Sequence, residues 1–156
     1  MRFFTGQYDR AIDAKNRIQL PSQVRGAIEG IGGGPGLYVT LGEHRGTLSI
    51  FTDRTFEALA DRIGTEVMPG PESRRFELQF YALASYVEID KQGRILLPER
   101  LCRKARLSGE VVLVGQKFRL DLWSRAELEK TMSIDWEGED WPDWQGFLRM
   151  KPSVEP

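Results

Sequence analysis

The sequence predicts an α+β protein, mainly β-strands with short helices, that is built from two tandem repeats. A nine-residue motif is the first observation: Asp13–Pro21 (DAKNRIQLP) recurs as Asp90–Pro98 (DKQGRILLP), with Asp, Arg, Ile, Leu and Pro at matching positions. Apolar runs of strand length and stretches of helical spacing then follow each copy in the same order. An internal repeat of this kind determines the architecture of the chain.

The first repeat, residues 1–68, consists of predicted strands and helices in alternation. Residues 4–13 alternate like a strand, with Tyr8, Arg10 and Ile12 on one face. A short helix is expected to open at Pro21, and two strands follow over 37–41 and 48–51 around a turn at 42–47. A closing helix carries three apolar residues on one face, which are Phe56, Leu59 and Ile63.

The second repeat, residues 73–133, has the same order. It begins with a helix whose apolar residues recur at i, i+4 and i+7, namely Phe76, Phe80 and Leu83, and a strand over 86–90 leads into the second motif. Another short helix follows Pro98, and strands are expected over 111–114 and 119–123. Ser124 and Glu127 form the capping-box pattern of a closing helix.

The composition is that of an ordinary globular protein, with 40% hydrophobic and 29% charged residues. No apolar run approaches the roughly 18 residues of a membrane span, and no signal peptide opens the chain. We therefore expect a cytoplasmic protein without a membrane partner. The net charge of −1 argues mildly against nucleic-acid binding. Its distribution is uneven, because residues 91–106 hold six bases and one acid, whereas residues 135–143 hold five acids and no base.

Each motif predicts a tight turn between two strand-like segments. Gly93 stands where such a turn needs a positive φ, and its counterpart Asn16 is the non-glycine residue that best tolerates that conformation. Asp13 and Asp90 are placed either to cap the turn through backbone N–H groups or to hold the motif arginine. The sequence leaves these two roles open.

The motif arginines, Arg17 and Arg94, are the candidate binding residues. The apolar residues after each arginine alternate inward at period two, so that the arginines face the other way. A purely structural explanation is that each arginine forms an ion pair with the motif aspartate and pins the turn. A functional explanation adds DNA, because guanidinium groups suit phosphate and grip the O6/N7 edge of guanine. The two explanations are compatible.

No pattern in the sequence indicates a catalytic site, a cofactor or a metal site, so the protein is not expected to be an enzyme. The single histidine, His44, falls in a predicted hairpin turn, and the single cysteine, Cys102, falls in a predicted helix as a small buried apolar residue. One cysteine excludes an internal disulfide and a cysteine-cluster metal site.

The C-terminal tail, residues 134–156, lies outside the repeats. It is acidic and carries Trp136, Trp141 and Trp144. This composition fits either a disordered extension or a segment that docks on a neighbouring surface, because tryptophan side chains favour burial.

The two Asp-x-x-x-Arg-Ile-x-Leu-Pro motifs resemble those of the MraZ family, bacterial transcriptional regulators of the division and cell-wall gene cluster. The resemblance covers about residues 3–132 and includes the segments 111–115 (VVLVG) and 120–124 (LDLWS). It implies a double-ψ, swapped-hairpin barrel of the AbrB/SpoVT type and a ring-shaped homo-oligomer. It also implies a nucleoid-associated regulator, usually a repressor, that binds G-rich direct repeats of double-stranded DNA in the promoter of its own operon.

Carried over to this chain, the resemblance places Arg17 and Arg94 at DNA bases and Lys15 and Lys91 at phosphates. The two Asp-x-x-x-Arg turns would be the elements that face DNA. This agrees with the preference of arginine for guanine.

The chain departs from the family pattern at three places. Asn16 replaces the usual glycine, Cys102 stands where a basic residue often follows the second motif, and the acidic tail is additional. The first change is expected to alter the approach of the first turn to DNA, and the second to remove a phosphate contact. An alternative of another class stays open: an oligomeric protein-interaction module without DNA binding, which the acidic pI of about 5.9 supports.

Overall fold

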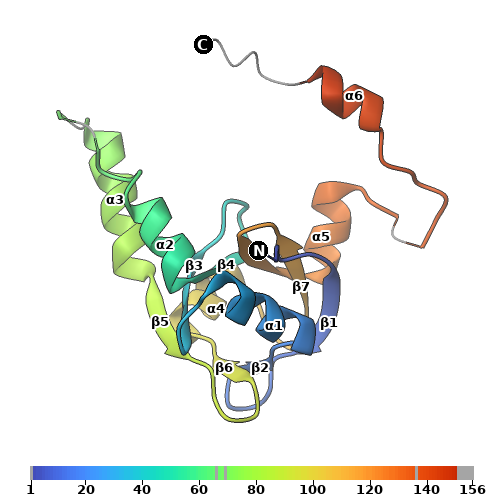
Figure 1. The fold of residues 1–156 in the computed structure, drawn as a ribbon, viewed down its shortest axis with the longest axis horizontal. Helices are drawn as coiled ribbons and strands as arrows, with labels where there is room; N and C mark the ends of the chain where they lie inside the picture. The colour runs from blue at the N-terminus through green and yellow to red at the C-terminus, as the bar shows by residue number, and fades with distance from the viewer. Residues whose placement is uncertain (1, 66, 69, 136, 151–156) are drawn as a thin grey trace.

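The computed structural model describes residues 2–65, 67–68, 70–135 and 137–150. Within these residues the chain forms eight strands and six helices (Figure 1), so the predicted α+β class is confirmed. In chain order the elements are β1 (Gln7–Ala11), β2 (Arg17–Gln19), α1 (Ser22–Ile31), β3 (Gly36–Leu41), β4 (Leu48–Thr52), α2 (Asp53–Ala60), α3 (Pro71–Leu83), β5 (Ser85–Glu88), β6 (Arg94–Leu96), α4 (Glu99–Ala105), β7 (Glu110–Gln116), β8 (Arg119–Ser124), α5 (Arg125–Met132) and α6 (Trp144–Arg149).

Six strands form one antiparallel sheet in the order β1-β7-β8-β4-β3-β5. The two halves of the chain interleave in this sheet. β1 from the first half pairs with β7 from the second half, with Tyr8 opposite Leu113. β5 from the second half pairs with β3 from the first half, with Val87 opposite Leu37. The halves meet again at the centre of the sheet, where β4 pairs with β8.

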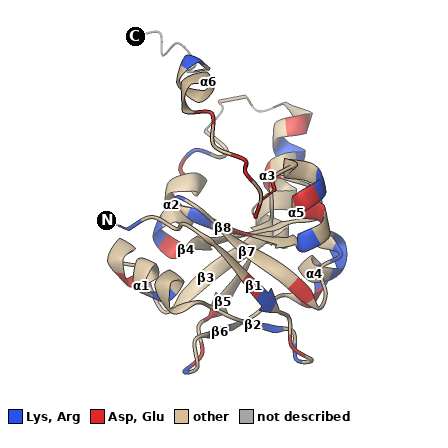
Figure 2. Cartoon of the chain, turned by 90° about the vertical axis from the view of Figure 1, so that its right-hand side faces the viewer, with Lys and Arg blue, Asp and Glu red and all other residues tan. Residues whose placement is uncertain are grey.

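The two shortest strands form a separate antiparallel pair that supports the motif turns. In this pair Ile18 of β2 lies opposite Ile95 of β6, and both side chains are buried. Leu20 and Leu97 are buried as well, which confirms the predicted inward alternation. Because β2 and β6 are antiparallel and one turn precedes each of them, the two turns lie at opposite ends of this pair. Both project from the same end of the molecule, at a distance from each other (Figure 2).

One apolar core is shared by both halves of the chain. It lies between the sheets and the two helices that follow the motifs, α1 and α4, and its members include Ile18, Val24, Ile28, Leu37, Ile50, Ile95, Leu101, Leu113 and Leu120. Burial of apolar surface is the main favourable term in folding, so this shared core stabilises both turns at once. Pro21 and Pro98 are the N-cap residues of α1 and α4, one position before the place expected for them.

The helices that close each half agree with the sequence pattern except at one end. Ser124 caps α5 as predicted, because its hydroxyl accepts a hydrogen bond from the Glu127 N–H at 3.1 Å. Helix α2 ends at Ala60, so Ile63 lies in the turn after the helix instead of in its last turn. This turn ends at Gly64, whose φ of +77° no α-helix can contain.

In the described part of the C-terminal tail the chain forms a helix, α6, which the sequence did not predict. The Asp143 carboxylate caps it by accepting a hydrogen bond from the Gly146 N–H at 2.9 Å. Figures 1 and 2 show α6 standing away from the sheet, on the side of the molecule opposite the motif turns. Trp141 and Trp144 are 87% and 65% exposed, so the described part of the chain buries neither. Trp136 and residues 151–156 lie outside the described residues.

Candidate functional site

The first motif turn is closed by the carboxylate of Asp13. Its Oδ1 accepts the backbone N–H groups of Lys15 at 2.9 Å and Arg17 at 2.8 Å, and its Oδ2 accepts the Nε–H of Arg17 at 2.9 Å. The backbone of Asp13 also bonds to the turn, since its carbonyl accepts the Asn16 N–H at 2.9 Å. The aspartate therefore caps the turn and holds the arginine, so both of the roles left open by the sequence are realised together.

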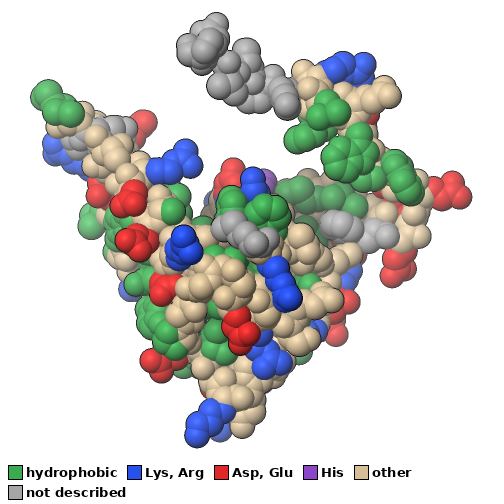
Figure 3. Space-filling view, viewed as in Figure 1, with side chains coloured by type: hydrophobic (Ala, Val, Ile, Leu, Met, Phe, Trp, Pro, Cys, Tyr) green, Lys and Arg blue, Asp and Glu red, His purple; other side chains and the backbone are tan. Residues whose placement is uncertain are grey.

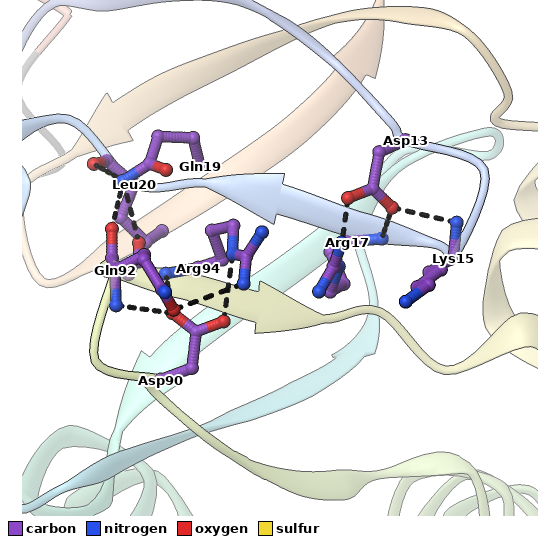
Figure 4. Close-up of polar contacts among 9 residues, drawn as sticks. Asp13, Lys15, Arg17, Gln19, Leu20, Asp90, Gln92 and Arg94 are labelled. Carbon is purple, nitrogen blue, oxygen red and sulfur yellow. Dashed lines mark hydrogen bonds and ion pairs between the residues drawn. The ribbon is translucent and has the colours of Figure 1, made fainter.

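The second motif turn repeats this geometry. Oδ1 of Asp90 accepts the N–H groups of Gln92 and Arg94, each at 2.9 Å, and Oδ2 accepts the Nε–H of Arg94 at 2.9 Å. One contact is added, because Nη2 of Arg94 donates to Oε1 of Gln92 at 3.1 Å. Figure 4 shows the two turns with these contacts dashed.

Hydrogen bonds lower the pKa of both motif carboxyl groups. The largest cause is the backbone N–H of the motif arginine, which donates to the charged carboxylate. Desolvation opposes this effect, while the guanidinium and a second backbone N–H add to it. Asp13 and Asp90 therefore stay ionised below the pH at which an ordinary aspartate is protonated, and each turn keeps a fixed pair of opposite charges.

The backbone of each turn has the left-handed conformation that the sequence predicted. Asn16 has a φ of +64° and Gly93 a φ of +78°. The Asn16 side chain points inward, where its Nδ2 donates to the Leu97 carbonyl at 2.6 Å and lies 3.8 Å from Sγ of Cys102. Two of the departures from the family pattern are thus in contact with each other.

Cys102 belongs to the interior of the site and not to its surface. Its side chain is buried in α4, as the sequence predicted, and burial raises the pKa of the Cys102 thiol. A side chain at this position faces Asn16 and the core, so the expected loss of a phosphate contact at position 102 has no support in the geometry.

The two turns are tied to each other. The Leu97 N–H donates to the Asn16 carbonyl at 2.9 Å, and the Leu20 N–H donates to the Gly93 carbonyl at 2.9 Å. Each bond joins a residue after one motif's strand to the turn of the other motif. Together with the β2–β6 pairing, these bonds fix the spacing of the two turns.

Each turn presents one arginine that is held in place and one lysine that is not. The side chains of Arg17 and Arg94 are 27% and 28% exposed, so both are accessible from solvent although both are ion-paired. Lys15 and Lys91 are exposed, and neither forms an ion pair within the described residues. The lysines are not equivalent, because Lys15 aligns with Gln92 in the repeat.

Three residues around the turns were not predicted. Gln92 holds the end of Arg94, and Nε2 of Gln19 donates to the Gln92 carbonyl at 2.7 Å. Arg25 of α1 lies against the second turn, since a Cβ at Gly93 would be 2.9 Å from the Arg25 side chain. The position of Gln92 inside the motif was a signal for its role, whereas nothing in the sequence connects Arg25 with the other motif.

The remaining sequence candidates lie away from the motif turns. His44 is exposed in the β3–β4 turn, and its ring centroid is 5.2 Å from that of Trp123. Across the residues that the structure describes, no group of three His, Cys, Asp or Glu side chains could hold a metal ion. Over the same residues, every helix is too short or too polar to cross a membrane.

Comparisons with known proteins extend the similarity well beyond the motifs. Residues 80–138 match the family model described as "MraZ protein, putative antitoxin-like". The transcriptional regulator MraZ of Coxiella burnetii (strain Dugway 5J108-111) is 35% identical over 89% of this chain and 90% of its own. The protein of the same name from Mycoplasma mobile is 31% identical over 86% of this chain and 88% of its own. The one from Thermomicrobium roseum is 34% identical over 78% of this chain and 81% of its own. With this identity over most of its length, the chain belongs to the MraZ family.

Proposed function

We propose that this protein is a transcriptional regulator that binds double-stranded DNA through its two motif turns. One observation carries the proposal: two turns of matching geometry project from the same end of the molecule, and each holds an arginine in place by an aspartate. The names of its relatives support the regulatory role. Following the family resemblance, we propose a cytoplasmic, nucleoid-associated repressor of its own division and cell-wall gene cluster that binds G-rich direct repeats.

The turns suit this role because they order the arginines before DNA arrives. Asp13 and Asp90 bind the Nε–H of Arg17 and Arg94, which leaves terminal N–H groups of each guanidinium for the O6 and N7 atoms of guanine. A side chain that is already ordered loses less entropy on binding. The exposed lysines of the two turns contact phosphates, which position the protein without reading sequence.

Self-association multiplies these contacts. We propose the ring-shaped homo-oligomer that the resemblance implies, in which every copy presents another pair of turns. Neighbouring pairs then bind successive DNA repeats, and the second contact becomes effectively intramolecular. Weak single contacts add up to useful affinity in this way.

The proposal is tested by Arg94→Ala on a DNA sequence selected by the wild-type protein from a random pool. We expect a loss of about 1–3 kcal/mol per base contact and a relaxed preference for guanine, measured by fluorescence anisotropy at two salt concentrations. Arg75→Ala is the matched control, because Arg75 is an exposed arginine of α3, away from the turns. An Arg94→Ala protein that binds the selected DNA as tightly and as selectively as the wild type would refute the proposal.

An interaction module without DNA binding is the second candidate. The observation in its favour is that both motif arginines already have aspartate partners, so each turn holds a neutralised pair. The net charge of −1 points the same way. A random pool from which the folded protein enriches no sequence, even at low salt, would favour this candidate.

A further inference from the structure

A groove lined by apolar and basic side chains lies between α2 and the β7–β8 turn. Its volume is about 510 Å³, within the roughly 300–1,000 Å³ of compact binding sites. Its apolar lining, called the floor below, includes Phe51, Leu59 and Phe118, and its basic lining, called the rim, includes Arg54, Arg62 and Lys117. The described residues that line the groove include no aspartate or glutamate.

Three cations of the rim have no carboxylate partner within the described residues. Arg54 donates to a backbone carbonyl at the end of α1 at 3.3 Å, and Nζ of Lys117 lies over the rings of Phe3 and Phe118 at 5.7 and 4.9 Å from their centroids. No ion pair of Arg62 occurs in the part of the chain that the structure describes. Like charges that gather around an apolar surface create a field that attracts an acidic, apolar partner.

The C-terminal tail has the complementary chemistry. Residues 135–143 carry five acids and no base. Large apolar side chains within and just after this acidic stretch are exposed, with Trp141 at 87%, Trp144 at 65% and Phe147 at 62%. Figure 3 shows hydrophobic side chains on the surface of the projecting segment that contains α6. Exposed aromatic side chains in such a cluster mark a contact surface, because their burial is strongly favourable.

We propose that residues 139–148, the acidic aromatic segment, occupy this groove in a second copy of the chain. Trp141 and Trp144 pack on the apolar floor, while Glu139 and Asp140 face the rim cations. The segment does not fill its own groove in the structure, because α6 stands away from the body of its own chain and both indoles are exposed. The proposal rests on the self-association proposed above but not on the DNA contacts, so a failure of DNA binding leaves it intact.

Disulfide cross-linking tests which copy supplies the segment. In a Cys102→Ala background, which removes the single native thiol, one chain carries Ala58→Cys in the groove. A longer, tagged chain carries Gln145→Cys, which keeps both indoles of the segment, and the two chains are co-expressed. Oxidation is expected to give a covalent species of the summed mass. The absence of a disulfide between these two chains would overturn the proposal. A single chain that carries both cysteines and forms the disulfide only within itself would overturn it as well.

Charge reversal tests the electrostatic part of the contact. Arg62→Glu with Lys117→Glu should raise the concentration for half-assembly about tenfold or more in sedimentation at low salt. Adding Glu139→Lys and Asp140→Lys should restore assembly. Arg103→Glu is the matched control, since Arg103 is exposed on α4 and α4 contributes no described residue to the groove.

Unchanged assembly of the reversed variant would overturn the contact between tail and groove while leaving self-association in place. A wild-type chain that stays monomeric would overturn both proposals. Circular dichroism of each variant confirms that the fold is retained.

Discussion

The first motif turn depends on a left-handed residue that is not glycine. Asn16 has a φ of +64°, and its side chain donates to the Leu97 carbonyl at 2.6 Å. Glycine at this position would keep the backbone conformation but lose the hydrogen bond. Alanine would lose the bond and would also resist the conformation. The pair Asn16→Gly and Asn16→Ala therefore separates the two contributions of Asn16 to stability.

The size of each effect follows from these contacts. Loss of the bond to Leu97 destabilises both variants by about 0.5–1.5 kcal/mol. Alanine in the left-handed region destabilises the folded state by roughly a further 1–2 kcal/mol. Relative to glycine, alanine also makes the unfolded chain less flexible, which restores roughly 0.4–1 kcal/mol of stability. We therefore expect Asn16→Gly to lose about 1 kcal/mol of unfolding free energy and Asn16→Ala about 2 kcal/mol.

Thermal and urea unfolding followed by tryptophan fluorescence measure these losses. For a chain of this length about 2 kcal/mol corresponds to a Tm lower by roughly 4–8 °C. The protein concentration must be held constant, because self-association shifts apparent stability. Lys15→Ala is the control, since Lys15 is an exposed neighbour in the same turn and should change stability by less than about 0.5 kcal/mol. An Asn16→Ala protein as stable as Asn16→Gly would refute the claim that the positive φ governs this position.

Three other outcomes follow from the described contacts. Acid should loosen both turns, because the folded pKa of Asp13 and of Asp90 lies below the ordinary value of 3.8. The stability that these carboxylates contribute is therefore complete above pH 3.8 and is lost as the pH falls through the folded pKa. Circular dichroism during an acid titration would detect this loss. Ser49→Ala should cost about 1.5–3 kcal/mol in urea unfolding, because Ser49 Oγ donates to the buried Asp121 carboxylate at 2.8 Å, and a loss below about 0.5 kcal/mol would contradict this. Lys15→Ala should reduce the slope of log affinity against log salt by about one without changing the guanine preference, and a changed preference in the selected DNA would count against a phosphate contact.

The order of the elements could be predicted because neighbouring residues encode each element. The alternation over residues 4–13, the apolar runs at 37–41 and 111–114, and the Ser124 cap are local signals, and the structure has an element at each. The pairing of the strands could not be predicted. The runs that form β3 and β7 are alike in length and apolar character. The residues of each run therefore do not indicate which of the two strands pairs with β1.

The same distinction holds for the candidate site. The left-handed backbone at Asn16 and Gly93 follows from residue chemistry alone, and the sequence predicted it. The contact between Asn16 and Cys102 depends on how the two motifs meet in space, and sequence separation hides it. The sequence signal for helix α6 is weak, because the residues before it are acidic and the helix is only six residues long, although Asp143 is a favoured N-cap residue.

The interleaved sheet bears on how the protein behaves on dilution. Strand β1 needs β7 beside it and β5 needs β3, so segments from both halves must meet before either edge of the sheet is complete. Two separate half-length chains could build this sheet only through a bimolecular encounter, whose yield falls as they become scarce. The covalent link from α2 to α3 makes that encounter intramolecular, so the sheet assembles independently of protein concentration. The motif turns can therefore form at any expression level.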